Sequence, residues 1–88
     1  MINGILLNDL DNVVTVTGDI STGEAVCYIR GGKTCKITAE EHIPQFHKIS
    51  VTDIEKGSDV MKYGERIGYA TKNISQGQHV HTHNVDNQ

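Results

Sequence analysis

Apolar residues along this chain fall in short, β-branched runs separated by glycine, asparagine and aspartate. The run V-V-T-V-T is typical of a strand, because branched side chains pack well on a pleated surface. Two further runs flank Gly31-Gly32 and predict a β-hairpin. The predicted strands cover residues 5–7, 13–17, 26–30, 33–38 and 46–51.

A second pattern is an eight-residue motif, [Asp/Asn]-Ile-x-x-Gly-x-x-Val, which occurs three times. The copies begin at Asp19, Asp53 and Asn73, so the intervals between them are unequal. In each copy the first residue starts a turn, isoleucine enters the core, glycine supplies a positive φ and valine begins a strand. Since the intervals are unequal, the motif predicts repeated corners of a folded sheet and not a solenoid.

Several local features refine this pattern. Residues 39–42 predict a brief helical turn that ends before Pro44. Gly64 predicts a tight turn, and Gly68 predicts a bulge or a close backbone approach. Residues 85–88 show no periodicity, and we expect a frayed tail or a link to a further segment.

Composition limits the chain to one small domain over residues 1–88. With one Phe and no Trp, the core must come from Ile, Val and Leu, which favours an all-β fold. The net charge of −3 and the absence of a Lys/Arg cluster argue against a nucleic-acid footprint or a surface for anionic membranes. Without a long apolar run or signal-peptide pattern, we expect a cytoplasmic protein.

The two cysteines predict free thiols. A two-residue loop at Gly31-Gly32 pairs residue 28 with Cys35 and Cys27 with residue 36. The thiols then differ by one register step and face opposite sides of the hairpin.

Three histidines, His79, His81 and His83, alternate with Val80 and Thr82 near the C-terminus. In an extended strand these imidazoles point to one face. A solvated strand edge explains such a row as well as a ligand site does, and spacing alone leaves both interpretations open.

The order of these motifs resembles the N-terminal domain of the altronate and galactarate dehydratase family, a small all-β module of the SAF type with a β-clip fold. The opening Asp11-Asn12-Val13 fits the same pattern. The matching positions run as Ile43-Pro44-x-x-His47-Lys48-Ile49, then Asp53-Ile54-x-x-Gly57-x-x-Val60-x-Lys62-Tyr63-Gly64-Glu65-x-Ile67-Gly68-x-Ala70, then Ile74-x-x-Gly77-x-x-Val80-His81-x-His83-Asn84. The resemblance covers nearly the whole chain.

This resemblance implies part of a metal-dependent hydro-lyase that dehydrates a sugar acid, of the altronate or galactarate type, to a 2-keto-3-deoxy acid. The implied cofactor is a divalent metal, with iron(II) first and manganese or zinc as alternatives. Because the large domain of the fused enzymes is absent from this sequence, we expect a small subunit, or an N-terminal-type domain, that needs a larger dehydratase or lyase subunit as its partner. The small subunit of sulfolactate sulfo-lyase is the alternative enzyme.

Removal of water from a hydroxy acid requires a base, a stabiliser of negative charge and an acid. The expected catalytic residues are His47, Lys48 and Glu65; the expected substrate-binding residues are Lys62, Tyr63 and Asn84; and the expected metal ligands are His81 and His83, with His79 or His47 as a third.

Each assignment has a structural alternative. His47 shares its predicted face with Ile49 and Val51, so spacing alone favours a core histidine, and only the resemblance reverses that preference. Lys48 and Lys62 suit carboxylate capture but are as readily solvated surface lysines.

A binding module without catalysis, which docks a sugar acid, a carbohydrate or a partner protein, is the alternative to an enzyme. Unpaired sheet edges also make a homo-oligomer an expectation for so small a domain.

Overall fold

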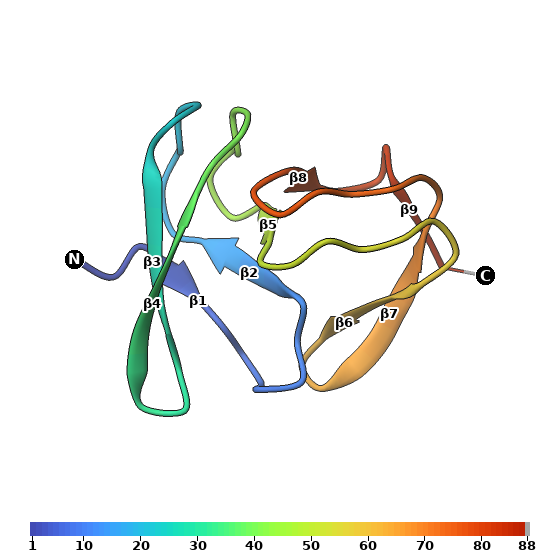
Figure 1. The fold of residues 1–88 in the computed structure, drawn as a ribbon, viewed down its shortest axis with the longest axis horizontal. Coiled ribbons are helices and arrows are strands. Elements are labelled where there is room, and N and C mark those ends of the chain that lie inside the picture. Colours follow the sequence, from blue (N-terminus) through green and yellow to red (C-terminus); the bar gives the residue numbers. More distant parts are fainter. Residues whose placement is uncertain (88) are drawn as a thin grey trace.

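Nine short strands form three small sheets in the computed structural model, which describes residues 1–87. A four-stranded antiparallel sheet has the order β1-β2-β5-β8 and lies between a β3-β4 hairpin and a β6-β7-β9 sheet (Figure 1). The strands are β1 Gly4–Ile5, β2 Val13–Val16, β3 Ala25–Arg30, β4 Lys33–Thr38, β5 Lys48–Ser50, β6 Asp59–Lys62, β7 Glu65–Ala70, β8 His79–Val80 and β9 Val85–Asp86. No helix occurs among these residues, so the all-β prediction is confirmed.

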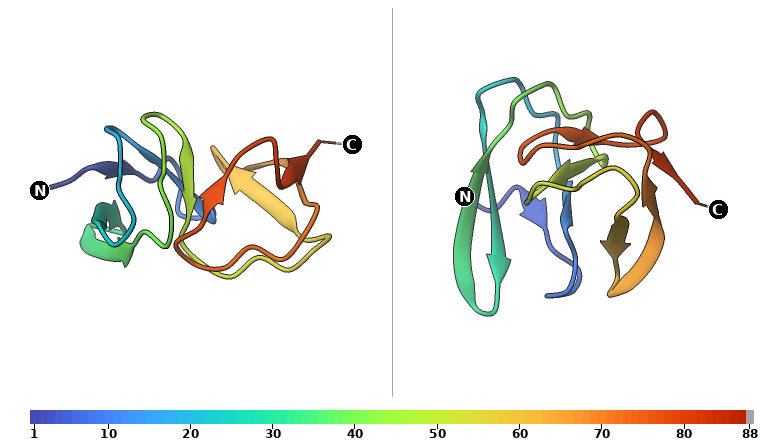
Figure 2. Two further views of the ribbon diagram at one scale, coloured as in Figure 1. Left: turned by 90° about the horizontal axis from the view of Figure 1, so that it is seen from above. Right: turned by 45° about the vertical axis from the view of Figure 1, so that its right-hand side comes forward.

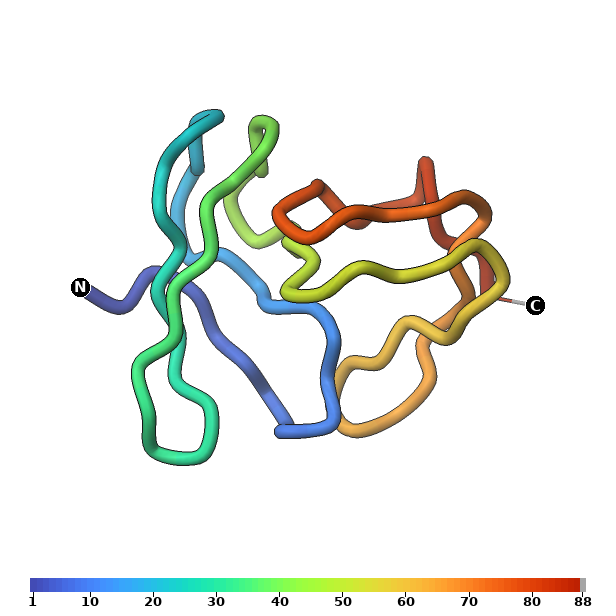
Figure 3. The backbone as a smooth tube through the Cα atoms, in the orientation of Figure 1, coloured from blue at the N-terminus to red at the C-terminus, as the bar shows by residue number. Residues whose placement is uncertain are grey.

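The two hairpin sheets occupy opposite ends of the molecule, and the central sheet joins them (Figure 2). The N-terminus lies at the β3-β4 end and the last described residues lie at the other (Figure 3). Within residues 1–87 there is no helix long and apolar enough to cross a bilayer.

Strand β2 separates two hydrophobic cores. Its side chains alternate, so Val14 and Val16 belong to the core beneath the β3-β4 hairpin, whereas Val13 belongs to the core beside β6 and β7. All three are at most 2% exposed. Successive valines can therefore follow one another along β2, because both faces of this strand are covered.

The repeated motif forms corners, as predicted, and the structure contains a fourth corner that the sequence pattern does not reveal. In each corner the isoleucine is at most 3% exposed, and the isoleucines bridge in pairs, Ile20 to Ile43 and Ile54 to Ile74. The residue at the glycine position donates its amide to a carbonyl of a neighbouring segment, as follows: Gly23 to Ala39, Phe46 to Val16, Gly57 to Ala70 and Gly77 to Ser50.

In the fourth corner, Phe46 occupies the position that glycine has in the other three. The three glycines have φ of 87°, 89° and 92°, and Phe46 has φ of 68°. An L side chain is strained in this left-handed region, so a search for glycine at this position passes over residues 42–49.

The β3-β4 hairpin confirms the predicted register. Tyr28 pairs with Cys35 and Cys27 pairs with Lys36, across a turn at Gly31-Gly32. Both cysteines are free, as expected, and the structure shows that they are partly buried.

The glycines of the second hairpin also behave as predicted. Gly64 has φ of 74° in the turn between β6 and β7. At Gly68 an added Cβ would lie 2.3 Å from the carbonyl oxygen of Asp86, and the register shifts between Val60 and Met61. Gly68 therefore allows the close approach of β9.

Some predicted elements are wrong or shorter. Residues 39–42 form no helical turn, because the amide of Ile43, which would donate to the carbonyl of Ala39 in a helix, donates to Ile20, and that carbonyl accepts the amide of Gly23. Strand 46–51 is limited to β5, since Phe46 and His47 belong to a corner. The first strand is Gly4–Ile5 and not residues 5–7.

The predicted tail is ordered where the structure describes it. Val85 pairs with Ala70 and Asp86 with Tyr69, which adds β9 to the edge of β7. Val85 also packs against the second core, so burial supplies the contact that the short sequence does not signal. Residue 88 of that prediction lies outside the described residues.

Candidate functional site

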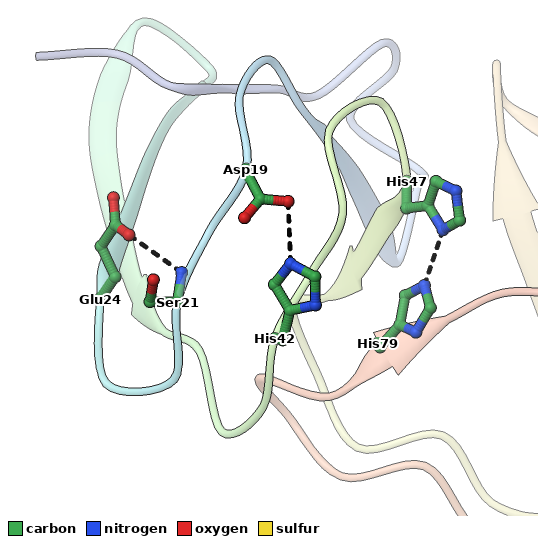
Figure 4. A network of polar contacts seen from close by, with 6 residues as sticks. All are labelled: Asp19, Ser21, Glu24, His42, His47 and His79. Atoms are coloured by element: carbon green, nitrogen blue, oxygen red, sulfur yellow. Dashed lines mark hydrogen bonds and ion pairs between the residues drawn. The ribbon is translucent and has the colours of Figure 1, made fainter.

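Four histidines gather where β5 lies beside β8. Lys48 pairs with Val80 in the antiparallel register, which brings His47, just before β5, opposite His81, just after β8. The His47 and His81 rings stack with centroids 4.0 Å apart. The Nδ1 atom of His47 lies 2.8 Å from the Nε2 atom of His79 (Figure 4). The His-Lys pair and the C-terminal histidine row therefore meet at one place.

The strand that the histidine row predicts ends early. β8 covers only His79–Val80, and the chain then turns so that the amide of Asn84 donates to the carbonyl of His81. The side chain of Asn84 holds this turn: its Oδ1 accepts the amide of His81 at 3.0 Å and its Nδ2 donates to the carbonyl of His79 at 2.8 Å. Alternation along a strand therefore does not explain the shared direction of the rings.

The rings nevertheless remain close to one another. The His79 ring lies 5.7 Å from that of His81 and 5.0 Å from that of His83, centroid to centroid. We call His47, His79 and His81 the imidazole cluster, because one nitrogen from each lies within 4.8 Å of one from both others. His83 is exposed and stands beside this cluster, outside that group.

Burial and mutual repulsion keep part of the cluster neutral. Burial, reinforced by the positive charge that His83, His47 and His81 would carry, lowers the pKa of His79 to about 4. The pKa of His81 is also lowered, by burial first and then by His47, Lys48 and His83. A neutral imidazole keeps a nitrogen lone pair, which is required to bind a metal or to accept a proton.

This donor set fits a divalent first-row metal ion. Imidazole nitrogen suits zinc, copper, iron and nickel, and open positions would remain beyond three protein ligands. Two ligands at about 2.1 Å from one ion are at most about 4.2 Å apart, so small ring rotations would bring all three nitrogens onto it. Of the two expected metal ligands, His81 belongs to this group and His83 lies outside it. The other two members, His47 and His79, were expected only as alternatives for a third ligand.

Lys48 lies beside the cluster and lines a cavity of about 320 Å³. Burial, and next the charge of Lys62, lower the pKa of its ammonium group. The residues around this cavity are Lys48, Ile67, His81, Thr82, Val85, Asp86 and Asn87. A cationic and partly apolar hollow therefore adjoins the imidazoles.

The remaining predicted site residues are placed differently. Tyr63 and Glu65 are exposed near the β6-β7 turn and do not line this cavity. The buried carboxylate of Asp11 fixes that turn by accepting the amides of Tyr63 and Gly64 at 3.0 and 2.8 Å. The Nζ atom of Lys62 lies 5.1 Å from the centroid of the Tyr63 ring.

Asn84, expected to bind substrate, is 3% exposed and bonded to backbone groups. Its role in the described structure is to shape the turn that carries His81. Sequence reasoning also gave Asp11 no role, although an Asp before a β-branched run is a usable signal for a buried turn anchor.

A family model for the SAF domain of altronate/galactarate dehydratases matches residues 2–88. The chain belongs to this family. The match confirms the resemblance carried by the corner motifs and by the residues around His47 and His81.

The relatives include dehydratases of much greater length. The chain is 39% identical to altronate dehydratase of Escherichia coli over 81 residues, 92% of this chain and 16% of that protein. It is 34% identical to galactarate dehydratase (L-threo-forming) of the same organism over 73 residues, which cover 13% of that enzyme.

A shorter relative is (2R)-sulfolactate sulfo-lyase subunit alpha of Paracoccus pantotrophus. It is 41% identical over 49 residues, 56% of this chain and 73% of that subunit. The chain thus spans a small part of the dehydratases and most of a protein named as one subunit of a lyase.

Proposed function

We propose that this chain is the small part of a hydro-lyase that dehydrates a sugar acid of the altronate or galactarate type. The observation that carries the proposal is the meeting of His47 and Lys48 with His79 and His81 at the junction of β5 and β8. A larger subunit or domain completes the site, since the dehydratase relatives extend far beyond the matched region.

The imidazole cluster is assigned to a divalent metal, with iron(II) first and manganese or zinc as alternatives. His47, His79 and His81 would hold the ion. When bound, it supplies positive charge that offsets the negative charge formed as the proton next to the carboxylate leaves.

The residues of this chain then bind and orient the acid. The Lys48 ammonium group attracts the anionic substrate toward the cluster. His83 is exposed beside the cluster, where its imidazole can form a hydrogen bond with the substrate or with water. The large part supplies the enclosure that a domain of this size cannot provide.

Sulfite elimination from a sulfolactate is the second candidate. It is favoured by the match to a protein named as a sulfo-lyase subunit, of which this chain covers 73%. The same site, in which Lys48 lies beside the imidazole cluster, would bind an acid that carries a sulfonate in place of the departing hydroxyl group.

Reconstitution tests the proposal. The purified chain is combined with the part of altronate dehydratase or galactarate dehydratase that lies outside the matched region, and dehydration of altronate and galactarate is followed together with sulfite release from sulfolactate. We expect negligible turnover by either protein alone and turnover by the mixture. High activity of the chain alone, or an inactive complex that is shown to form, would contradict the proposal.

A further inference from the structure

Lys48, on the wall of the cavity of about 320 Å³, has no ion-pair partner among residues 1–87. Among residues 1–87, no carboxylate oxygen lies within 4.0 Å of the Lys48 ammonium group, and this group donates no hydrogen bond. Yet Lys48 is half-buried, and its electrostatic neighbours are the cationic Lys62 and the imidazole of His81. A partly buried cation without a partner is unfavourable unless an anion reaches it.

The walls of the cavity define what kind of anion fits. The lining residues Thr82 and Asn87 have side chains that can donate hydrogen bonds, and Ile67 and Val85 provide an apolar side. The volume of about 320 Å³ is at the lower end of ligand pockets. It suits one end of a small polyhydroxy acid and not a nucleotide or a large cofactor.

The one acidic residue on the wall does not occupy this place. Asp86 is exposed, and its Oδ1 atom accepts the amide of Asn87 at 2.7 Å. It forms no ion pair with Lys48 in the described residues. The ammonium group remains available to a ligand.

We propose that this cavity is the subsite for the carboxylate group of a small hydroxy acid, which Lys48 binds and which Thr82 and Asn87 flank, beside the imidazole cluster. The choice of a hydroxy acid rests on the proposed function; the presence of an anion site rests on the geometry alone. His81 lines this cavity and also belongs to the imidazole cluster, so the carbon atoms next to a carboxylate held here would lie beside that cluster.

Heteronuclear NMR titration of the full-length, ¹⁵N-labelled chain tests the subsite in a metal-stripped, low-salt buffer near neutral pH. The probes are galactarate, galactitol, which has the same carbon chain without carboxylates, and sulfate at matched ionic strength. We expect galactarate to shift the amides of Lys48, Thr82 and Asn87 in a saturable manner. Galactitol that shifts them equally, or sulfate that binds them with equal affinity, would overturn the assignment to a carboxylate.

Two pairs of variants locate the effect. Lys48→Met should weaken galactarate binding about 10- to 100-fold, as expected for loss of one charged hydrogen-bond donor, whereas Lys33→Met at the tip of the β3-β4 hairpin should leave it unchanged. Thr82 is exposed, so Thr82→Asp should fold and abolish binding by placing a carboxylate in the cavity, and Thr82→Asn should retain it. Unchanged binding in both Lys48→Met and Thr82→Asp would refute the subsite.

The titration tests the subsite and the reconstitution tests the lyase proposal, so either proposal can be refuted without the other. An active complex whose small chain shows no carboxylate binding leaves the lyase proposal intact and removes the subsite. Carboxylate binding without activity in any complex retains the subsite and removes the lyase proposal.

Discussion

The Nδ1 atom of His47 lies 2.8 Å from the Nε2 atom of His79, although the two residues are 32 positions apart in the sequence. One belongs to the corner before β5 and the other begins β8. Their contact is a consequence of the antiparallel pairing of these strands, because Ile49 opposite His79 fixes the register. Any ligand of the imidazole cluster therefore depends on this pairing.

Metal binding is the first prediction. By calorimetry with manganese(II) or zinc(II), or with iron(II) under anaerobic conditions, we expect one ion per chain and at least a tenfold loss of affinity in His79→Ala and in His47→Ala. His42→Ala is the matched control, since His42 lies outside the imidazole cluster and its Nε2 atom is 2.8 Å from the Oδ1 atom of Asp19 (Figure 4). His83→Ala tests the pair expected from spacing. An equal loss in His42→Ala, or none in His79→Ala, would contradict the cluster assignment.

The pH dependence of stability is the second prediction. His79 has a folded-state pKa of about 4, below its ordinary value of 6.5, so the unfolded chain binds more protons between these values. The contribution of His79 to stability is present in full above about pH 6.5 and is lost as the pH falls toward 4. His83, His47 and His81 oppose its protonation, and Glu41 favours it.

Denaturant unfolding of the metal-free chain across this range measures the effect. The midpoint of the parent chain should fall with acidification more steeply than that of His79→Gln, which has no titrating group at this position. Parallel pH profiles for the two chains would show that His79 is not the group responsible.

Much of the architecture could be predicted from the sequence because its signals are local. The β3-β4 register depends on a two-glycine loop, and the corners around Gly23, Gly57 and Gly77 depend on residues a few positions apart. The signals that failed are non-local. β9 forms because Val85 reaches the second core, and β8 stops because the Asn84 side chain replaces strand hydrogen bonds.

The sequence predicted that histidines form the candidate site, but it did not predict which histidines lie close together. The proximity of His47 to the C-terminal histidines follows from the pairing of β5 with β8, which the sequence does not encode at short range. His83 appeared equivalent to His81 only because a strand was expected through both. Once the chain turns at His81, spacing of two no longer determines which rings share a ligand.

Phe46 gives the third prediction. It is 69% exposed at φ of 68°, where the other three corners have glycine, so its ring gains little from burial within this domain. Phe46→Gly should stabilise the chain by about 0.5–1 kcal/mol, because relief of left-handed strain outweighs the added freedom of the unfolded state. Phe46→Ala removes the ring but keeps the strain and should show no such gain. The free energies come from urea unfolding. Equal stabilities of the two variants would show that strain is absent at this corner.

Asn84 gives the fourth prediction, which separates a structural role from the substrate contact expected from sequence. Asn84→Ala would leave the amide of His81 and the carbonyl of His79 without their side-chain partner, and should cost about 1–3 kcal/mol of unfolding free energy. It should also weaken metal binding, because the turn that positions His81 loosens. Gln45→Ala, at an exposed corner residue that donates to the carbonyl of Thr17, is the control and should change stability far less. Full stability of Asn84→Ala, combined with a lost response to galactarate, would instead identify Asn84 as a substrate contact.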